Sequence, residues 1–74
     1  MLPIFDGRKF AYQRKACGFT QKKLGEAIGT TGQHIQTWEY GKKTPTASFL
    51  LRAMILLGCY PTDLIKEKEA PAVE

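Results

Sequence analysis

Apolar residues recur along most of the chain at spacings of three and four, which is the pattern of amphipathic helices. Glycines divide this pattern into short segments, and a capping residue precedes nearly every segment. The divisions predict five helices, over residues 7–17, 21–28, 32–40, about 47–57 and about 61–67. No segment combines polar–apolar alternation with β-branched residues, so the pattern predicts no strand.

The expected helix boundaries rest on single residues. Ser, Thr, Asp and Asn side chains accept hydrogen bonds from the first N–H groups of a helix, and glycine adopts the left-handed conformation that ends one. Pro61 suits the first turn of the last segment, because its missing N–H would be unpaired there anyway. Four segments have both a cap and a terminating glycine: Asp6 and Gly18, Thr20 and Gly29, Thr31 and Gly41, and Thr46 and Gly58.

These elements predict an all-α fold of five short helices around one core. A chain of 74 residues with 43% apolar content suffices for one domain, expected over residues 1–68, followed by a frayed tail over 69–74. With two cysteines and one histidine, the chain cannot be a disulfide-stapled scaffold, and a four-ligand structural zinc site is not expected.

The chain shows no feature of an enzyme, a secreted protein or a membrane protein. It has no Ser–His–Asp set, Gly-rich phosphate loop or converging carboxylates, so no catalysis and no cofactor are expected. The most apolar window, residues 49–60, is too short to span a bilayer, and no N-terminal run suits a signal peptide. We therefore expect a soluble cytoplasmic protein without a metal, a membrane partner or an evident small-molecule ligand.

Charge is distributed unevenly along the chain. Residues 1–43 carry eight Lys or Arg and three acids, a net charge of +5, whereas residues 44–74 carry three bases and four acids, a net charge of −1. A one-sided basic charge on a small domain favours a polyanionic partner. Many small soluble domains are mildly basic, so the charge alone is weak evidence for a nucleic-acid partner.

The segments 21–28 and 32–40 are joined by three residues only, which forces the two helices to cross at a steep angle. Gly25 supplies the small residue that a close crossing needs, at a cost of roughly 1 kcal/mol against Ala in a helix. Gly29 supplies the positive φ of a sharp exit. The inner seam would be closed by apolar side chains: Leu24, Ile28, Ile35 and Trp38.

This pattern over residues 21–40 resembles the helix-turn-helix of the phage repressor and Cro family of DNA-binding proteins. The resemblance extends through GFTQ (18–21), WEYGK (38–42) and GCYPTDLI (58–65), and so covers roughly residues 8–66. It implies a lambda-repressor-like fold and a bacterial or phage-encoded transcriptional regulator, with a repressor expected. The partner would be double-stranded DNA, with the helix 32–40 in the major groove.

The resemblance also implies which residues touch DNA. Gln33 is the strongest base-reading candidate, because its amide can pair bidentately with adenine. Gly32 departs from the family, in which many relatives carry a base-reading side chain. Base contacts are expected from Gly32, Gln33, Gln36 and Thr37, and phosphate contacts from Gln21, Lys22, Lys23, Tyr40, Lys42 and Lys43.

The two lysines at 22 and 23 support this interpretation independently. They occupy the first turn of a helix, where the macrodipole disfavours cations and folding alone would favour acids. Phosphates that approach the same helix N-terminus would explain them. The plainer alternatives are solubilising charge for the lysines and a solvated polar face for Gln33, Gln36 and Thr37.

Five further residues receive roles other than base or phosphate contact. In relatives, an arginine at the position of Arg14 pairs with a glutamate at the position of Glu39, which would lock the first helix onto the third. The spacing of Trp38 from Ile35 predicts a core residue, and Cys17 is expected to be buried on the core side of its helix. His34 is expected at the surface or facing phosphate rather than binding a metal.

A weak symmetric homodimer is expected, because one recognition helix covers only a few base pairs. Its predicted surface consists of Leu51, Ile55, Cys59 and Tyr60. Alternatively, the last helix or the tail folds over Ile55 within one chain. A different function also stays open: the same fold can serve as a protein-interaction module, such as an antitoxin or an assembly adaptor.

Overall fold

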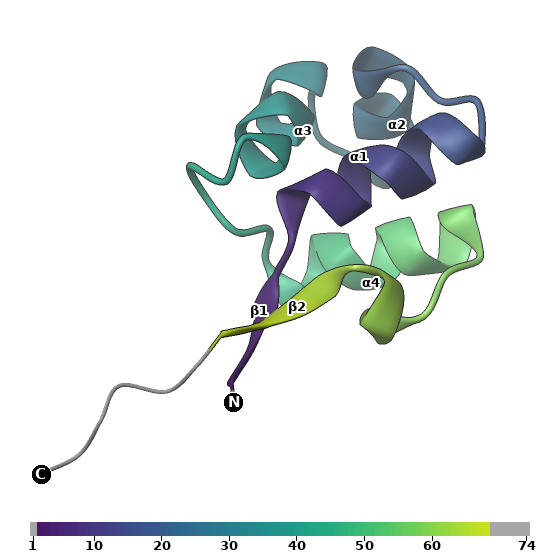
Figure 1. The fold of residues 1–74 in the computed structure, drawn as a ribbon. Coiled ribbons are helices and arrows are strands. Elements are labelled where there is room, and N and C mark those ends of the chain that lie inside the picture. The colour runs from purple at the N-terminus through teal and green to yellow at the C-terminus, as the bar shows by residue number, and fades with distance from the viewer. Residues whose placement is uncertain (1, 69–74) are drawn as a thin grey trace, which may run out of the picture.

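The computed structural model describes residues 2–68, and the expected tail over 69–74 lies outside them. Its centre is a helix-turn-helix formed by α2 (Gln21–Ile28) and α3 (Gly32–Glu39). Helix α1 (Gly7–Ala16) packs against α3, and α4 (Ala47–Leu57) packs against α2. The two ends of the described range form strands β1 (Leu2–Phe5) and β2 (Ile65–Lys68) (Figure 1). The expected all-helical helix-turn-helix core is confirmed, with four α-helices in place of five.

The predicted caps account for where the helices begin. Asp6 Oδ1 accepts hydrogen bonds from the N–H groups of Arg8 (2.9 Å) and Lys9 (3.3 Å). Threonine hydroxyls cap the next three helices in the same way, at 3.0–3.4 Å from the N–H three residues on. Each cap satisfies a donor that has no partner inside its helix. The capping residues in the sequence therefore determine where these four helices begin.

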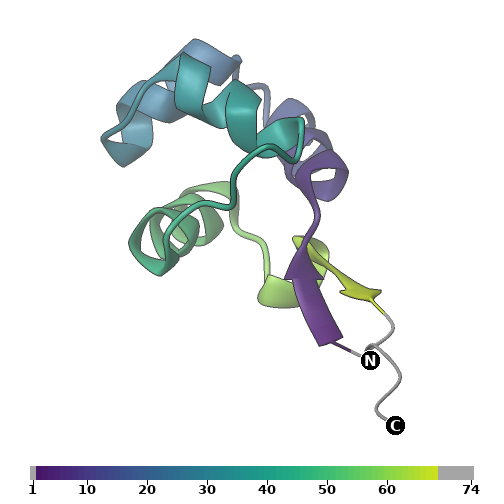
Figure 2. The ribbon, with the colours of Figure 1, turned by 90° about the vertical axis from the view of Figure 1, so that its left-hand side faces the viewer.

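The fifth predicted helix, over 61–67, is wrong. Pro61–Asp63 forms only a single 3-10 turn, and the chain then becomes extended as β2. Strand β2 pairs antiparallel with β1, in a register that sets Phe5 opposite Ile65 and Leu2 opposite Lys68. The pairing gives backbone partners to both chain ends, and this tertiary contact outweighs the weak local preference of the segment. Figure 2 shows the two strands side by side, away from α2 and α3.

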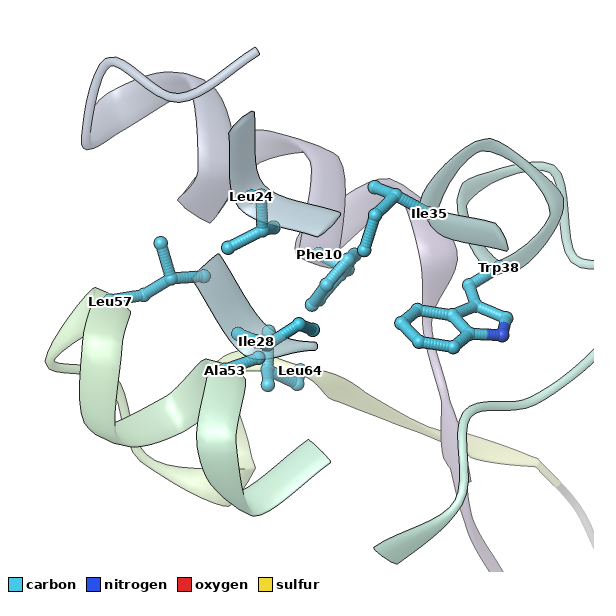
Figure 3. Packing of buried hydrophobic residues seen from close by; sticks show 8 residues of the cluster. All are labelled: Phe10, Leu24, Ile28, Ile35, Trp38, Ala53, Leu57 and Leu64. Atoms are coloured by element: carbon cyan, nitrogen blue, oxygen red, sulfur yellow. The ribbon is translucent and has the colours of Figure 1, made fainter. Parts of the chain in front are cut away.

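The core lies where all four helices and the 3-10 turn meet (Figure 3). Phe10, Leu24, Ile35 and Leu64 are its largest fully buried side chains. The indole of Trp38 packs edge-on against Phe10, with 6.2 Å between ring centroids, and Phe5 of β1 lies 5.6 Å from Phe10 on the same measure. The prediction that Trp38 is a core residue is confirmed. A two-stranded sheet is marginal alone, so Phe5 and Leu64 anchor it to the helices.

The expectation that Cys17 is buried is wrong. Helix α1 ends one residue earlier than predicted, so Cys17 forms the C-cap and its side chain is exposed. Its Sγ still lies 3.5 Å from the carbonyl oxygen of Leu57 at the end of α4. Cys17 therefore sits at the rim of the core rather than inside it.

Candidate nucleic-acid interface

The crossing of α2 over α3 is as tight as Gly25 suggests. A β-carbon at this position would lie 2.5 Å from the carbonyl carbon of Thr31 and 2.8 Å from the nitrogen of Gly32. Both are backbone atoms, which cannot move aside as the end of a side chain can. Gly29 ends α2 with a φ of +88°, in the left-handed region that favours glycine. The two glycines together set the angle at which α3 leaves the body of the protein.

Helix α3 has one buried face and one polar face. Ile35 and Trp38 point into the core, whereas Gln33 and Gln36 are exposed. Neither glutamine amide forms a hydrogen bond to any residue within 2–68, so both keep their donors and acceptors for a ligand. Thr37 is half-buried, and its hydroxyl donates to the carbonyl oxygen of Gln33 at 2.9 Å. Thr37 therefore retains only its acceptor capacity toward the solvent.

Gly32 does not face outward with the other predicted base contacts. A β-carbon on Gly32 would lie 2.8 Å from the Cα of Lys22, so this position faces the first turn of α2. The prediction of an outward position is corrected, because the helix crossing leaves no room for a side chain there. Only the backbone of Gly32 remains available for a contact.

Exposed cations flank the polar face of α3. Lys22 and Lys23 occupy the first turn of α2, which contains no acidic residue, and Lys42 and Lys43 follow the end of α3. None of the four forms an ion pair within residues 2–68. The phenol of Tyr40 is 69% exposed beside them. The structure therefore places the predicted phosphate-contacting residues, apart from Gln21, at the surface.

Gln21 belongs to a buried network instead. Arg14 Nε and Nη2 donate to the two carboxylate oxygens of Glu39, at 2.6 and 3.1 Å, and Gln21 Nε2 donates to Glu39 Oε1 at 3.0 Å. The side chains of Arg14 and Glu39 are only 8% and 6% exposed. The structure thus brings the predicted pair together in bidentate geometry. Because Arg14 Nη1 also donates to the carbonyl oxygen of Phe19 at 2.8 Å, the network joins α1, α3 and the start of α2.

Two positioning residues were not found from the sequence. A β-carbon on Gly7 would lie 2.5 Å from the carbonyl oxygens of Trp38 and Glu39, so the start of α1 abuts the end of α3. Arg52 Nη1 donates to the carbonyl oxygen of Ile28 at 3.1 Å and so closes the C-terminus of α2. The contact at Gly7 had one signal in the sequence, namely a glycine in the first turn of a predicted helix. The contact of Arg52 had no local signal, because it joins residues 24 positions apart.

His34 is exposed, as expected, at the start of α3. Its Nδ1 lies 2.7 Å from the hydroxyl oxygen of Thr30, and its ring stacks on Trp38 at 6.5 Å between centroids. No group of three or more His, Cys, Asp or Glu within residues 2–68 is placed to hold a metal ion. None of the helices in the same range is long and apolar enough to cross a membrane.

The predicted apolar strip on α4 lies at the surface. Ile55 is 82% exposed, Leu51 55% and Tyr60 74%, and they border a shallow hollow of about 360 Å³. The segment 61–68 does not fold over Ile55, contrary to the alternative based on a fifth helix. Cys59 is half-buried and packs against the core. Burial of its thiol, and then the nearby carboxylate of Asp63, raises the pKa of Cys59.

Comparison with known proteins agrees with this architecture. The family described as "Helix-turn-helix" matches residues 10–64, and the chain belongs to that family. It is 32% identical over 56 residues to the HTH-type transcriptional regulator DicA of Escherichia coli (strain K12), which covers 76% of this chain. The chain spans only 42% of the length of that relative.

Solved structures share the fold. The P22 c2 repressor, crystallised with a synthetic operator, superposes with a TM-score of 0.70 at 29% identity over 74% of this chain and 83% of its own. The regulator of biofilm formation SinR, crystallised with DNA, also gives 0.70, at 22% identity over 77% and 95% of the two chains. The restriction-modification controller C.AhdI of Aeromonas hydrophila gives 0.70 at 21% identity, over 77% and 86%. The last two likenesses concern the fold alone.

Proposed function

We propose that this chain is a transcriptional regulator that binds double-stranded DNA in a sequence-specific manner, with α3 in the major groove. The observation that carries the proposal is the polar face of α3. Gln33 and Gln36 lie exposed opposite the buried Ile35 and Trp38, and free lysines stand at both sides of this face. The likeness to DicA, a transcriptional regulator, and to the P22 c2 repressor, crystallised with an operator, supports the same function.

The chemistry of the face suits base reading and phosphate contact separately. The amide oxygen of a glutamine can accept a hydrogen bond from the N6 amino group of adenine while its N–H donates to N7, and this pair of contacts identifies adenine. Gln33 is the first exposed side chain of α3, in the N-terminal turn that would face the base edges. The four lysines and Tyr40 would set the position of the protein on the backbone without reading sequence. Occupation of a promoter in this way would repress transcription.

A single α3 covers only a few base pairs, so the proposal includes a homodimer. Two copies related by a two-fold axis would read half-sites about 34 Å apart. The exposed strip of Leu51, Ile55 and Tyr60, with Cys59 at its edge, supplies an apolar surface for this contact. It is small, so the dimer would be weak in solution and complete only on DNA.

Selection of bound fragments from random double-stranded DNA tests the function directly. We expect one enriched site, and binding to it, measured by fluorescence anisotropy, should weaken steeply between 50 and 200 mM salt. The Gln33→Ala variant should lose about 1–3 kcal/mol at one base pair and bind unrelated DNA as the wild type does. Lys42→Gln is the matched control and should weaken binding to all sequences alike. Failure to enrich any sequence, or affinity indifferent to salt, would favour the protein-interaction module.

A further inference from the structure

A basic hollow lies beside the proposed DNA-binding face, between α1, the start of α2 and the end of α3. It measures about 490 Å³. A hollow of this size accommodates a phosphate group together with several waters, since a water occupies about 30 Å³. Its lining consists of Arg8, Ala11, Arg14, Lys15, Gln21, Glu39 and Tyr40.

The charge of this hollow is unbalanced. The Glu39 carboxylate is already neutralised by the two hydrogen bonds from Arg14, and the pair is nearly buried. Arg8 and Lys15 are both exposed, and neither forms an ion pair within residues 2–68. Arg8 also borders a second hollow, which Asp63 lines as well. The Asp63 carboxylate accepts a hydrogen bond from the N–H of Tyr60, and it lies beyond ion-pair distance from Arg8. The hollow therefore carries two uncompensated positive charges.

The spacing of these residues makes one continuous lining. Arg8 and Lys15 are seven positions apart on α1, which is two helical turns, or about 10.5 Å along the axis. Ala11 lies between them on the same face, and its small side chain leaves the floor of the hollow open. Folding does not explain Arg8, because a cation in the first turn of a helix opposes the macrodipole.

We infer that this hollow binds a backbone phosphate of DNA, held by Arg8 and Lys15, outside the contacts made by the helix-turn-helix itself. Tyr40 and Gln21 border both the hollow and the proposed DNA surface, so the two are continuous. Gln21 retains one amide proton after donating to Glu39. This inference rests on the proposed function and extends the DNA footprint from α2 and α3 onto α1.

The salt dependence of DNA binding tests it. Each phosphate contact adds about 0.9 to the steepness of log affinity against log salt, so Arg8→Gln with Lys15→Gln, which removes both partners of one phosphate, should lower the steepness by about 0.9. At 0.1 M salt the double substitution should weaken binding by about eightfold, on every sequence alike. The control variant Lys66→Gln removes one positive charge from β2, outside the hollow, and should leave the slope unchanged. Urea unfolding of each variant confirms that the fold is kept.

The outcomes separate the two proposals. Wild-type binding without any salt dependence would overturn the proposed function, and the inference with it. A steep wild-type slope that the double variant retains would overturn the inference alone. Titration with inorganic phosphate, followed by the backbone amide resonances of Lys15 and Tyr40, provides the second arm. Saturation by free phosphate together with an unchanged DNA slope would identify a site for free phosphate, and would also overturn the assignment to DNA.

Discussion

The network of Arg14, Glu39 and Gln21 makes the sharpest prediction about stability. Glu39→Ala removes a carboxylate that accepts three hydrogen bonds, and it leaves the nearly buried guanidinium of Arg14 without its counter-charge. Removing one partner of such a pair costs about 3–5 kcal/mol. A domain of this length has roughly 4–11 kcal/mol of total stability. The Glu39→Ala variant should therefore lose at least about a quarter of the total stability, and all of it at the low end of that range.

Two further variants separate charge from shape. Glu39→Gln keeps the size of the side chain and an acceptor, so it should lose only about 1.5–3 kcal/mol, the difference made by hydrogen bonds to a charged group. The double variant Arg14→Met with Glu39→Met replaces both charges by apolar groups, and this exchange is often close to neutral. The double variant should thus be more stable than Glu39→Ala. Its affinity for DNA should still fall, because Gln21 would lose the acceptor that orients its amide.

Urea unfolding measures these differences through the fluorescence of the single tryptophan, Trp38, which is buried and precedes Glu39 on α3. The linear dependence of the free energy of unfolding on urea gives each value, provided that the slope is unchanged between variants. A double-mutant cycle on Arg14 and Glu39 should give a coupling of about 2–3 kcal/mol. A coupling below about 0.5 kcal/mol would refute the reasoning, since the two side chains would then act as independent surface charges.

Two other substitutions test the geometry of the proposed DNA complex. Gly25→Ala should destabilise the protein by about 1–2 kcal/mol, because overpacking against the Thr31 backbone outweighs the better helix propensity of alanine; a gain in stability by urea unfolding would show that the crossing is looser. Ile55→Lys should abolish cooperative binding to an operator with two half-sites and leave single-half-site affinity and the melting temperature unchanged; binding of the full operator with wild-type cooperativity would place the dimer surface elsewhere.

The sequence predicts the helical core well because the relevant signals are local. Each N-cap and each terminating glycine acts within one helical turn, so Thr20, Gly29, Thr46 and Gly58 mark the observed ends of α2 and α4. The inward set of Leu24, Ile35 and Trp38 follows from helical periodicity alone. The Gly25 crossing is predictable as well, because a three-residue link allows few arrangements.

The errors at the two strands and at Gly32 have a common physical origin in contacts between segments that are not adjacent in the sequence. The strands β1 and β2 are separated by the whole domain, and neither has a strand pattern of its own. The outward direction assigned to Gly32 failed because the Lys22 backbone lies against it. Arg8 and Lys15 were similarly inconspicuous, since only the packing of α1 against α3 places them beside Tyr40. Local patterns cannot reveal such neighbours.

The basic residues at helix starts show that this chain gives up some stability at its candidate site. Lys22 and Lys23 stand at the positive end of α2, where each opposes the macrodipole by about 0.3–1 kcal/mol, and no acid in that turn offsets them. Arg8 also stands in the first turn of α1, although there the Asp6 carboxylate caps the helix. At Glu39, by contrast, the chain provides partners for both oxygens of a nearly buried carboxylate. Charges are thus satisfied where they hold the helices together and left free where α1 and α2 face the solvent, which is the distribution that a phosphate backbone would complete.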